Sequence, residues 1–146
     1  MPKIDFYILP VTDEAPRLRF ACRLIEKLYQ QRHRIYIHTQ NQTQAHQLDE
    51  LLWTYQEESF LPHNLYGEGP ESAPPIQIGF DTIPENQHDI LMNLASSAPE
   101  FYIQFSRILE VISSSPDVQA AGRENYRFYR AKRCEITTHK LQSVEA

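Results

Sequence analysis

The side chains with the clearest chemical potential gather in residues 123–133, where the sequence reads RENYRFYRAKR. Arg123, Tyr126, Arg127 and Arg130 stand at i, i+3, i+4 and i+7, a spacing that places side chains on one face of a helix. Guanidinium groups on such a face can hold a carboxylate through paired hydrogen bonds, or contact phosphates beside a stacking phenol. A solvated basic face has the same pattern, so the spacing alone leaves these interpretations open.

A second group of candidate side chains lies in WTYQEESFLPHNLYGEGP, residues 53–70. Its aromatic residues and prolines favour either a docking surface, since Trp and Tyr anchor interfaces, or a satellite hydrophobic cluster under a long loop. His63 could serve there as the general base of a hydrolase or nuclease. However, no Ser or Cys nucleophile motif accompanies it, so a histidine bonded within an ordered loop is the preferred interpretation.

Motifs for cofactors and metals are not found in the sequence. The six histidines and two cysteines do not stand at metal-ligand spacing, and we expect Cys22 and Cys134 to be free thiols. The turn VTDEAP (11–16) follows the first expected strand, but it has no glycine and carries two carboxylates, which repel phosphate. We therefore expect no enzyme activity, no cofactor and no metal.

The charge of the chain is unevenly distributed along the sequence. The formal net charge is −5, yet residues 41–100 hold ten acidic residues and no Lys or Arg. This asymmetry indicates two differently charged faces and two partners, and it leaves little positive surface for direct nucleic acid binding. No apolar run reaches membrane-spanning length and no signal peptide pattern is present, so a cytoplasmic protein is expected.

The hydrophobic pattern predicts the elements that must position these residues. We expect strands at 4–10, 34–39, 75–80, 89–94 and 106–112, and helices at 16–32, 43–55 and 116–133. Strands that alternate with helices predict a mostly parallel α/β sheet in one domain covering residues 1–146. Residues 56–75 are expected to be irregular, and residues 134–146 remain unassigned, as a candidate flexible tail.

Several of these segments together resemble one protein family. LDELLWTYQEESFLPHNLYGEGP (48–70) is similar to the LDE-x-LW…SF-x-PH-x-L…GEGP signature of the chi subunit of bacterial DNA polymerase III holoenzyme. DILMNL (89–94) and RENYRFYR (123–130) resemble a strand and the closing helix of that family, and the likeness runs nearly end to end. The resemblance implies a three-layer, Rossmann-like α/β fold that lacks a nucleotide-binding loop, and a non-catalytic role.

The resemblance also implies two protein partners. One is the psi subunit, which tethers chi to the clamp loader, and the other is the acidic C-terminal tail of single-stranded DNA-binding protein. An accessory DNA-repair helicase is the alternative partner, and association with the nucleoid would come through these partners. The implied tail-binding residues are Ile112, Arg123, Tyr126 and Arg127, with Arg130 as a further candidate. The implied psi-binding residues are Trp53, Phe60, Pro62, His63 and Leu65.

One position departs from the family pattern. Gln119 stands where the family has a Lys earlier in the last helix, so this chain offers one positive charge fewer to an acidic peptide. Arg130 is the residue that we expect to compensate for it.

Overall fold

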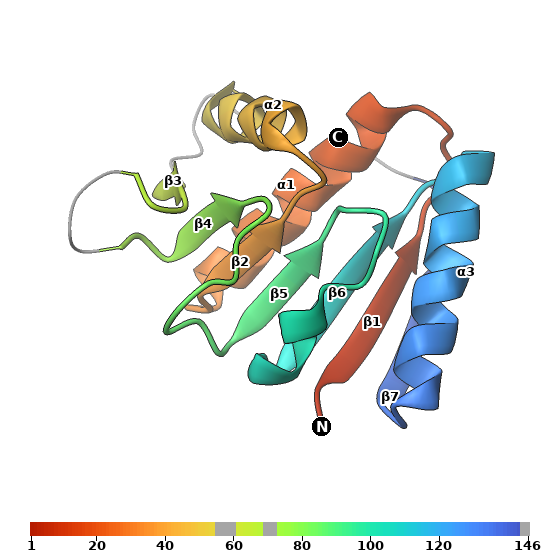
Figure 1. Ribbon diagram of the computed structural model, residues 1–146. Coiled ribbons are helices and arrows are strands. Elements are labelled where there is room, and N and C mark those ends of the chain that lie inside the picture. Colours follow the sequence, from red (N-terminus) through yellow and green to blue (C-terminus); the bar gives the residue numbers. More distant parts are fainter. Residues whose placement is uncertain (55–60, 69–72, 144–146) are drawn as a thin grey trace.

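Seven strands form one sheet, with helices packed on both of its faces (Figure 1). The computed structural model describes residues 1–54, 61–68 and 73–143. The strands are β1 (Lys3–Ile8), β2 (Ile35–His38), β3 (His63–Leu65), β4 (Ile76–Gly79), β5 (Ile90–Asn93), β6 (Arg107–Ile112) and β7 (Glu135–Lys140). The helices are α1 (Glu14–Gln30), α2 (Gln42–Thr54) and α3 (Pro116–Ala131), and a short 3-10 helix, η1, spans Glu100–Gln104.

The strand order is β3-β4-β2-β5-β6-β1-β7, and every pairing among the described strands is parallel. Strand β1 therefore lies between β6 and the edge strand β7. In this register Phe6 stands opposite Glu110 on one side and Thr138 on the other. The predicted parallel α/β architecture is confirmed.

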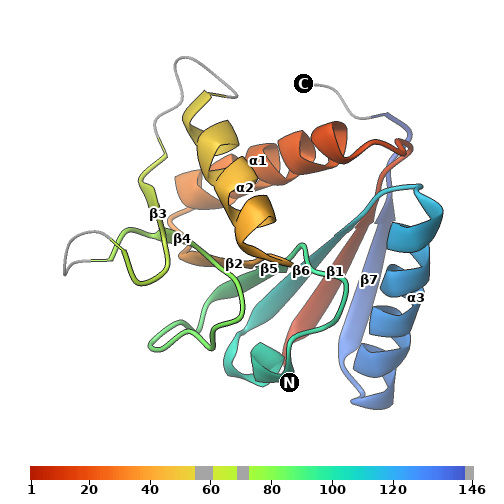
Figure 2. The same cartoon turned by 45° about the horizontal axis from the view of Figure 1, so that its top comes forward.

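Alternating side chains divide the core into two layers. Ile35 and Ile37 pack with α1 and α2 on one face of the sheet, whereas Tyr36 points to the opposite face with residues of η1 and α3. Figure 2 shows α1 and α2 on one side of the strands and α3 on the other. The three layers follow from the period-2 pattern of the strands, because successive side chains point to opposite faces.

Three elements were not expected from the sequence: β3, η1 and β7. Strand β7 reads EITTHK, which is too polar to stand out as a strand, and most of its residues are at least partly exposed. Among the described strands it pairs with β1 alone, and His139 Nε2 lies 2.9 Å from the buried Asp5 carboxylate of that strand. The segment left unassigned as a candidate tail therefore contributes an edge strand, and residues 144–146 lie outside the described residues.

A buried arginine joins α1 to the carboxyl ends of two strands. Arg17 Nε donates a hydrogen bond to the carbonyl of Val111 at 2.9 Å, and its Nη2 donates to the carbonyl of Leu94 at 3.0 Å. Its Nη1 lies 2.8 Å from a carboxylate oxygen of Glu14, which balances the charge. Because Arg17 is buried, these contacts are not replaced by water when the side chain is removed.

The substitution Arg17→Met should lower the free energy of unfolding by about 2–4 kcal/mol, because it leaves buried carbonyls without donors while keeping a similar length of side chain. Urea denaturation followed by circular dichroism measures the change. The exposed Arg19 on the same helix provides the matched control, since Arg19→Met should change stability by less than about 0.5 kcal/mol. Equal losses in the two variants would contradict this role of Arg17.

Candidate functional site

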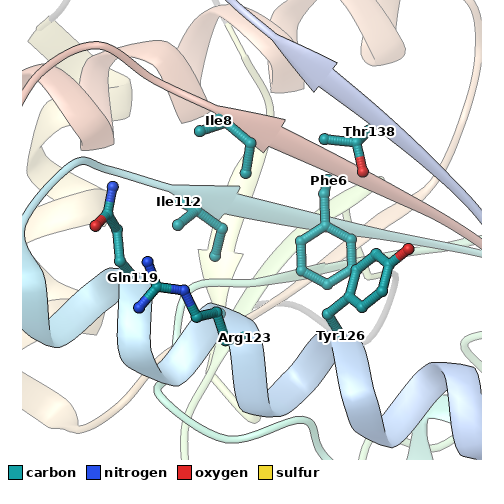
Figure 3. Close-up of a pocket in the computed structure, with 8 residues that line it drawn as sticks. Phe6, Ile8, Ile112, Gln119, Arg123, Tyr126 and Thr138 are labelled. Carbon is teal, nitrogen blue, oxygen red and sulfur yellow. The ribbon is translucent and has the colours of Figure 1, made fainter.

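A pocket of about 250 Å³ lies between α3 and the β1–β7 end of the sheet (Figure 3). It combines an apolar floor from the strands with polar side chains from the helix. Its lining residues are Phe6, Ile8, Ile112, Gln119, Gly122, Arg123, Tyr126 and Thr138. The sequence predictions Ile112, Arg123 and Tyr126, which come from two different elements, meet in this one pocket.

The floor of the pocket is built by the strand register. Phe6 and Ile8 are two residues apart on β1, so their side chains point to the face that carries α3. Thr138 stands opposite Phe6 across the β1–β7 pair, and Ile112 ends β6. The sequence did not indicate Phe6, Ile8 or Thr138 as site residues, although the period-2 pattern of β1 places the first two on one face.

Close packing of α3 on β6 depends on a glycine. A Cβ atom added at Gly122 would lie 2.9 Å from Cδ1 of Ile112, which is shorter than real contacts of this kind. A side chain at position 122 would therefore push the Ile112 side chain or the helix away. Gly122 thus sets the distance between the helix and the floor of the pocket.

The rim of the pocket carries a cation and a phenol. The ring of Tyr126 packs 5.5 Å from the ring of Phe6, centroid to centroid, and its residue remains 36% exposed. Figure 3 shows Arg123 extending from the helix between Gln119 and Tyr126. A guanidinium and a hydroxyl beside an apolar floor can bind a carboxylate together with an adjoining apolar group.

The other two basic residues of the predicted face do not line this pocket. Arg127 is exposed and forms an ion pair with Glu124 one turn earlier in α3. Arg130 is exposed one turn beyond Tyr126. Both positions contribute positive charge next to the pocket without contacting its floor, while Gln119 does line it. Spacing alone could not separate these residues, because neighbouring positions on a helix face differ by only part of a turn.

The second candidate surface surrounds Trp53 at the end of α2. The residue is 50% exposed, and its ring packs 4.4 Å from the ring of His63, centroid to centroid. Pro62 and Leu65 lie close to His63 in the chain. Both are partly buried, and Leu65 packs against the core. The structure thus brings four of the five predicted residues to one region, and Phe60 lies outside the described residues.

His63 is held inside this surface and is not presented to solvent. Its side chain has 0% exposure, and its Nε2 lies 3.2 Å from Oδ1 of Asp49. Its Nδ1 lies 2.6 Å from the carbonyl oxygen of Leu61. Both ring nitrogens are therefore engaged by described residues, an arrangement that fits a structural role better than that of a general base.

Comparison with known proteins gives one consistent result. The family described as "DNA polymerase III chi subunit, HolC" matches residues 1–137 of this chain. The protein is 37% identical over 144 residues to the DNA polymerase III subunit chi of Pseudomonas aeruginosa, covering 99% of this chain and 100% of that one.

The chain belongs to the DNA polymerase III chi subunit family. It is also 30% identical over 143 residues to the DNA polymerase III subunit chi of Escherichia coli, covering 94% of this chain and 97% of the relative. The corresponding protein of Haemophilus influenzae is 28% identical over 138 residues, covering 94% of this chain and 96% of that one. The family resemblance predicted from the sequence is confirmed.

Within the described residues, no three His, Cys, Asp or Glu side chains form a group that could hold a metal ion. The free thiols expected at Cys22 and Cys134 are confirmed, and both are buried. No helix in the described ranges is long and apolar enough to cross a bilayer.

A buried carboxylate joins helix α3 to the sheet directly behind the pocket. Glu110 of β6 is 1% exposed, and it accepts hydrogen bonds from Tyr129 Oη at 2.7 Å and Asn93 Nδ2 at 2.9 Å. Asn125 Nδ2 of α3 donates a longer bond, 3.4 Å, to its other oxygen. The sequence analysis missed Glu110, although one acidic residue inside the apolar strand RILEVI is a signal that could have found it.

Burial raises the pKa of the Glu110 carboxyl to about 7, because the hydrogen bonds from Asn93, Tyr129 and Asn125 and the charge of Arg17 offset desolvation only in part. The ordinary pKa is near 4.5, so between these two values the unfolded chain has lost a proton that the folded chain retains. The contribution of Glu110 to the free energy of unfolding is therefore complete below about pH 4.5 and decreases as the pH rises to about 7.

The substitution Glu110→Gln should remove this contribution, because the amide does not titrate. The unfolding free energy of the wild type, relative to that of Glu110→Gln, should therefore fall steadily from about pH 5 to about pH 7. These limits lie roughly between the ordinary pKa of the carboxyl and its pKa in the folded chain. Urea denaturation at half-unit pH steps measures this difference. A difference that stays constant across the interval would show that Glu110 does not titrate there.

Proposed function

We propose that this protein is a non-catalytic accessory subunit of the replisome that bridges two partners. One surface binds the acidic C-terminal tail of single-stranded DNA-binding protein, and the other binds the psi subunit of the clamp loader. Membership of the chi family supports the setting in the DNA polymerase III holoenzyme, hence in the cytoplasm. The observation that carries the proposal is the pocket that joins Arg123 and Tyr126 to an apolar floor.

The chemistry of the pocket matches the end of such a tail. A peptide that ends in an apolar residue presents a hydrophobic side chain and a free carboxylate on the same carbon. Phe6, Ile8 and Ile112 offer apolar surface for the side chain, while Arg123 on the rim suits the carboxylate. Acidic residues earlier in the tail would meet the positive charge of Arg127 and Arg130.

The distribution of charge supports two separate partners. Residues 41–100 hold ten acidic residues and no Lys or Arg. This segment includes α2 and strands β3, β4 and β5. The pocket lies at the opposite end of the sheet, beside β1, β7 and the basic residues of α3. An acidic tail is therefore attracted to the pocket and repelled from the surface around Trp53.

Arg123→Ala should weaken binding of an acidic peptide that ends in phenylalanine by about tenfold or more, because a charge-assisted contact to its carboxylate is lost. Fluorescence anisotropy with a rhodamine-labelled peptide measures the affinity, which should also fall with added salt. Arg19→Ala removes the same charge from an exposed site on α1 and serves as the control.

Adding a positive charge at the pocket should change the peptide affinity in the opposite direction. Gln119→Lys adds a positive charge at a position that lines the pocket, so it should strengthen peptide binding at low salt. Wild-type affinity in Arg123→Ala, together with no response in Gln119→Lys, would show that the peptide binds elsewhere.

The Trp53 surface has the features of a docking site for psi. A half-exposed indole packed on the buried ring of His63 is a rigid aromatic anchor, and such anchors carry much of the binding energy of protein interfaces. The family resemblance implies psi contacts at Trp53 and Phe60, with Pro62, His63 and Leu65 as their neighbours. The buried ring of His63 would act there by supporting the ring of Trp53. An accessory helicase that uses the same residues would compete with psi for this surface.

Trp53→Ala should weaken psi binding by about tenfold or more, because the exposed anchor of the interface is removed. Binding of the acidic peptide should remain at the wild-type level, since the pocket lies at the other end of the sheet. Calorimetric titration with purified psi and with the peptide measures both affinities. The neighbouring exposed variant Thr54→Ala should bind psi normally, and unchanged psi binding in Trp53→Ala would contradict this assignment.

A further inference from the structure

Strand β7 ends the sheet, and the edge that it turns away from β1 has no partner strand among the described residues. All six residues of β7 stay in parallel register with β1. Native edge strands are commonly guarded by a proline, a bulge or a charge, because an open row of backbone groups pairs with other chains. In EITTHK the fixed charges stand at the two ends, and the residues between them include no proline or glycine. The edge of β7 is therefore suited to pair with a further strand.

The backbone groups of every second residue in β7 point to this open edge. The N–H of Leu141, directly after the strand, donates to the carbonyl of Ile8 at 3.0 Å. Because the direction of backbone groups alternates along a strand, the odd-numbered residues of β7 direct theirs toward β1. The N–H and C=O groups of Ile136, Thr138 and Lys140 therefore point outward. Within the described chain, no backbone hydrogen bond joins these outward groups to another segment.

The open edge is continuous with the peptide pocket. Thr138 lines the pocket and is exposed, and its N–H and C=O belong to the outward set. Figure 3 shows Thr138 on β7 beside Phe6 on β1, with Tyr126 of the helix facing the same space. Neighbouring strands lie about 4.8 Å apart, and an extended residue spans about 3.4 Å. A chain that leaves the pocket across Thr138 thus reaches pairing distance of β7 within about two residues.

The charges along β7 favour an acidic chain at the end near the pocket. Lys140 is exposed and stands opposite Ile8, a residue of the pocket floor, in the register with β1. Its side chain points to the same face as that of Thr138, two residues earlier. Glu135 at the other end of the strand repels acidic residues. The half of the edge that suits an acidic peptide is therefore the one formed by Thr138 and Lys140.

We propose that the segment directly before the terminal residue of the acidic peptide pairs with the open edge of β7 as a short additional strand. This inference rests on the proposed function of the pocket. The pocket recognises the end of the peptide, while backbone hydrogen bonds to β7 hold the extended chain that leads into it. A second copy of this chain is the competing partner for the same edge, and the experiment distinguishes the two.

Methylation of the peptide backbone tests this pairing without changing the protein. Single N-methyl groups are placed at each of the last five peptide nitrogens of an N-acetylated acidic peptide that ends in phenylalanine. Calorimetric titration of the full chain gives the affinity of each peptide. Only alternate N–H groups of a paired strand donate to its neighbour, so two methylations separated by one residue should each weaken binding by about fivefold or more. The methylation between them should change the affinity by less than about twofold.

Hydrogen exchange measured by NMR reports the same contact from the side of the protein. In the free chain, the amides of Thr138 and Lys140 should exchange quickly, whereas those of Thr137 and His139 should exchange slowly because they donate to β1. A saturating concentration of the unmodified peptide should slow exchange at Thr138 and Lys140 by about tenfold or more.

A matched pair of variants separates the backbone contact from the charge. Lys140→Pro removes an outward N–H and leaves the bonds to β1, at a kind of position where edge strands accept proline. Lys140→Gln removes the same charge and keeps the N–H. Peptide affinity should therefore be lower in Lys140→Pro than in Lys140→Gln by about threefold or more. Thermal denaturation of both variants checks that they are folded, and the methylated peptides give the result independently of them.

The outcomes distinguish this inference from the proposed function. Methylated peptides that all keep the unmodified affinity, or all lose it equally, would overturn the pairing and leave the pocket in place. Equal affinities in the two folded Lys140 variants would do the same. Amides of Thr138 and Lys140 that are already protected in the free chain, with a dimer in sedimentation equilibrium, would assign the edge to a second copy and overturn the inference. An unmodified peptide that does not bind would overturn the proposed function as well.

Discussion

The contact between helix α3 and the buried Glu110 is the interaction on which the geometry of this protein depends. A carboxylate placed in the middle of a sheet is costly to desolvate, and it is accommodated here only because Tyr129, Asn93 and Asn125 supply donors. Apolar packing of Tyr126 on Phe6 and the close approach of Gly122 to Ile112 also hold α3 against the strands. Directed hydrogen bonds to one acceptor define a single position, and that position leaves the pocket over Phe6 and Ile8 open.

The rest of the fold separates this pocket from the surface around Trp53. A parallel sheet with the order β3-β4-β2-β5-β6-β1-β7 puts the acidic segment 41–100 toward one end and the basic helix α3 toward the other. Under the proposed function, this separation would let two partners that differ in charge bind at the same time without contacting each other. The turn that a nucleotide-binding relative would use for phosphate carries carboxylates instead, which is consistent with a fold that serves protein partners.

Local pattern was sufficient to predict the parallel α/β architecture, because the strands and helices of this chain have clear periodicity. It also placed Arg123 and Tyr126 on one helix face, and both line the pocket, while their role in binding stays a prediction. It failed at the edge strand β7, whose polar residues depend on pairing with β1, and consequently at Thr138. It also failed to distinguish Arg127, which pairs with Glu124, from Arg123 at the pocket, because that difference depends on the tertiary position of α3.

The central claim is that the pocket beside α3 binds an acidic peptide through its terminal residue. Two-dimensional amide NMR spectra of the labelled protein, recorded while the unlabelled peptide is added, test it most directly. The account predicts that the largest shifts belong to Phe6, Ile8, Gly122 and Thr138, while the indole signal of Trp53 stays in place. Shifts centred on Trp53 and Leu65, with none around the pocket, would contradict it.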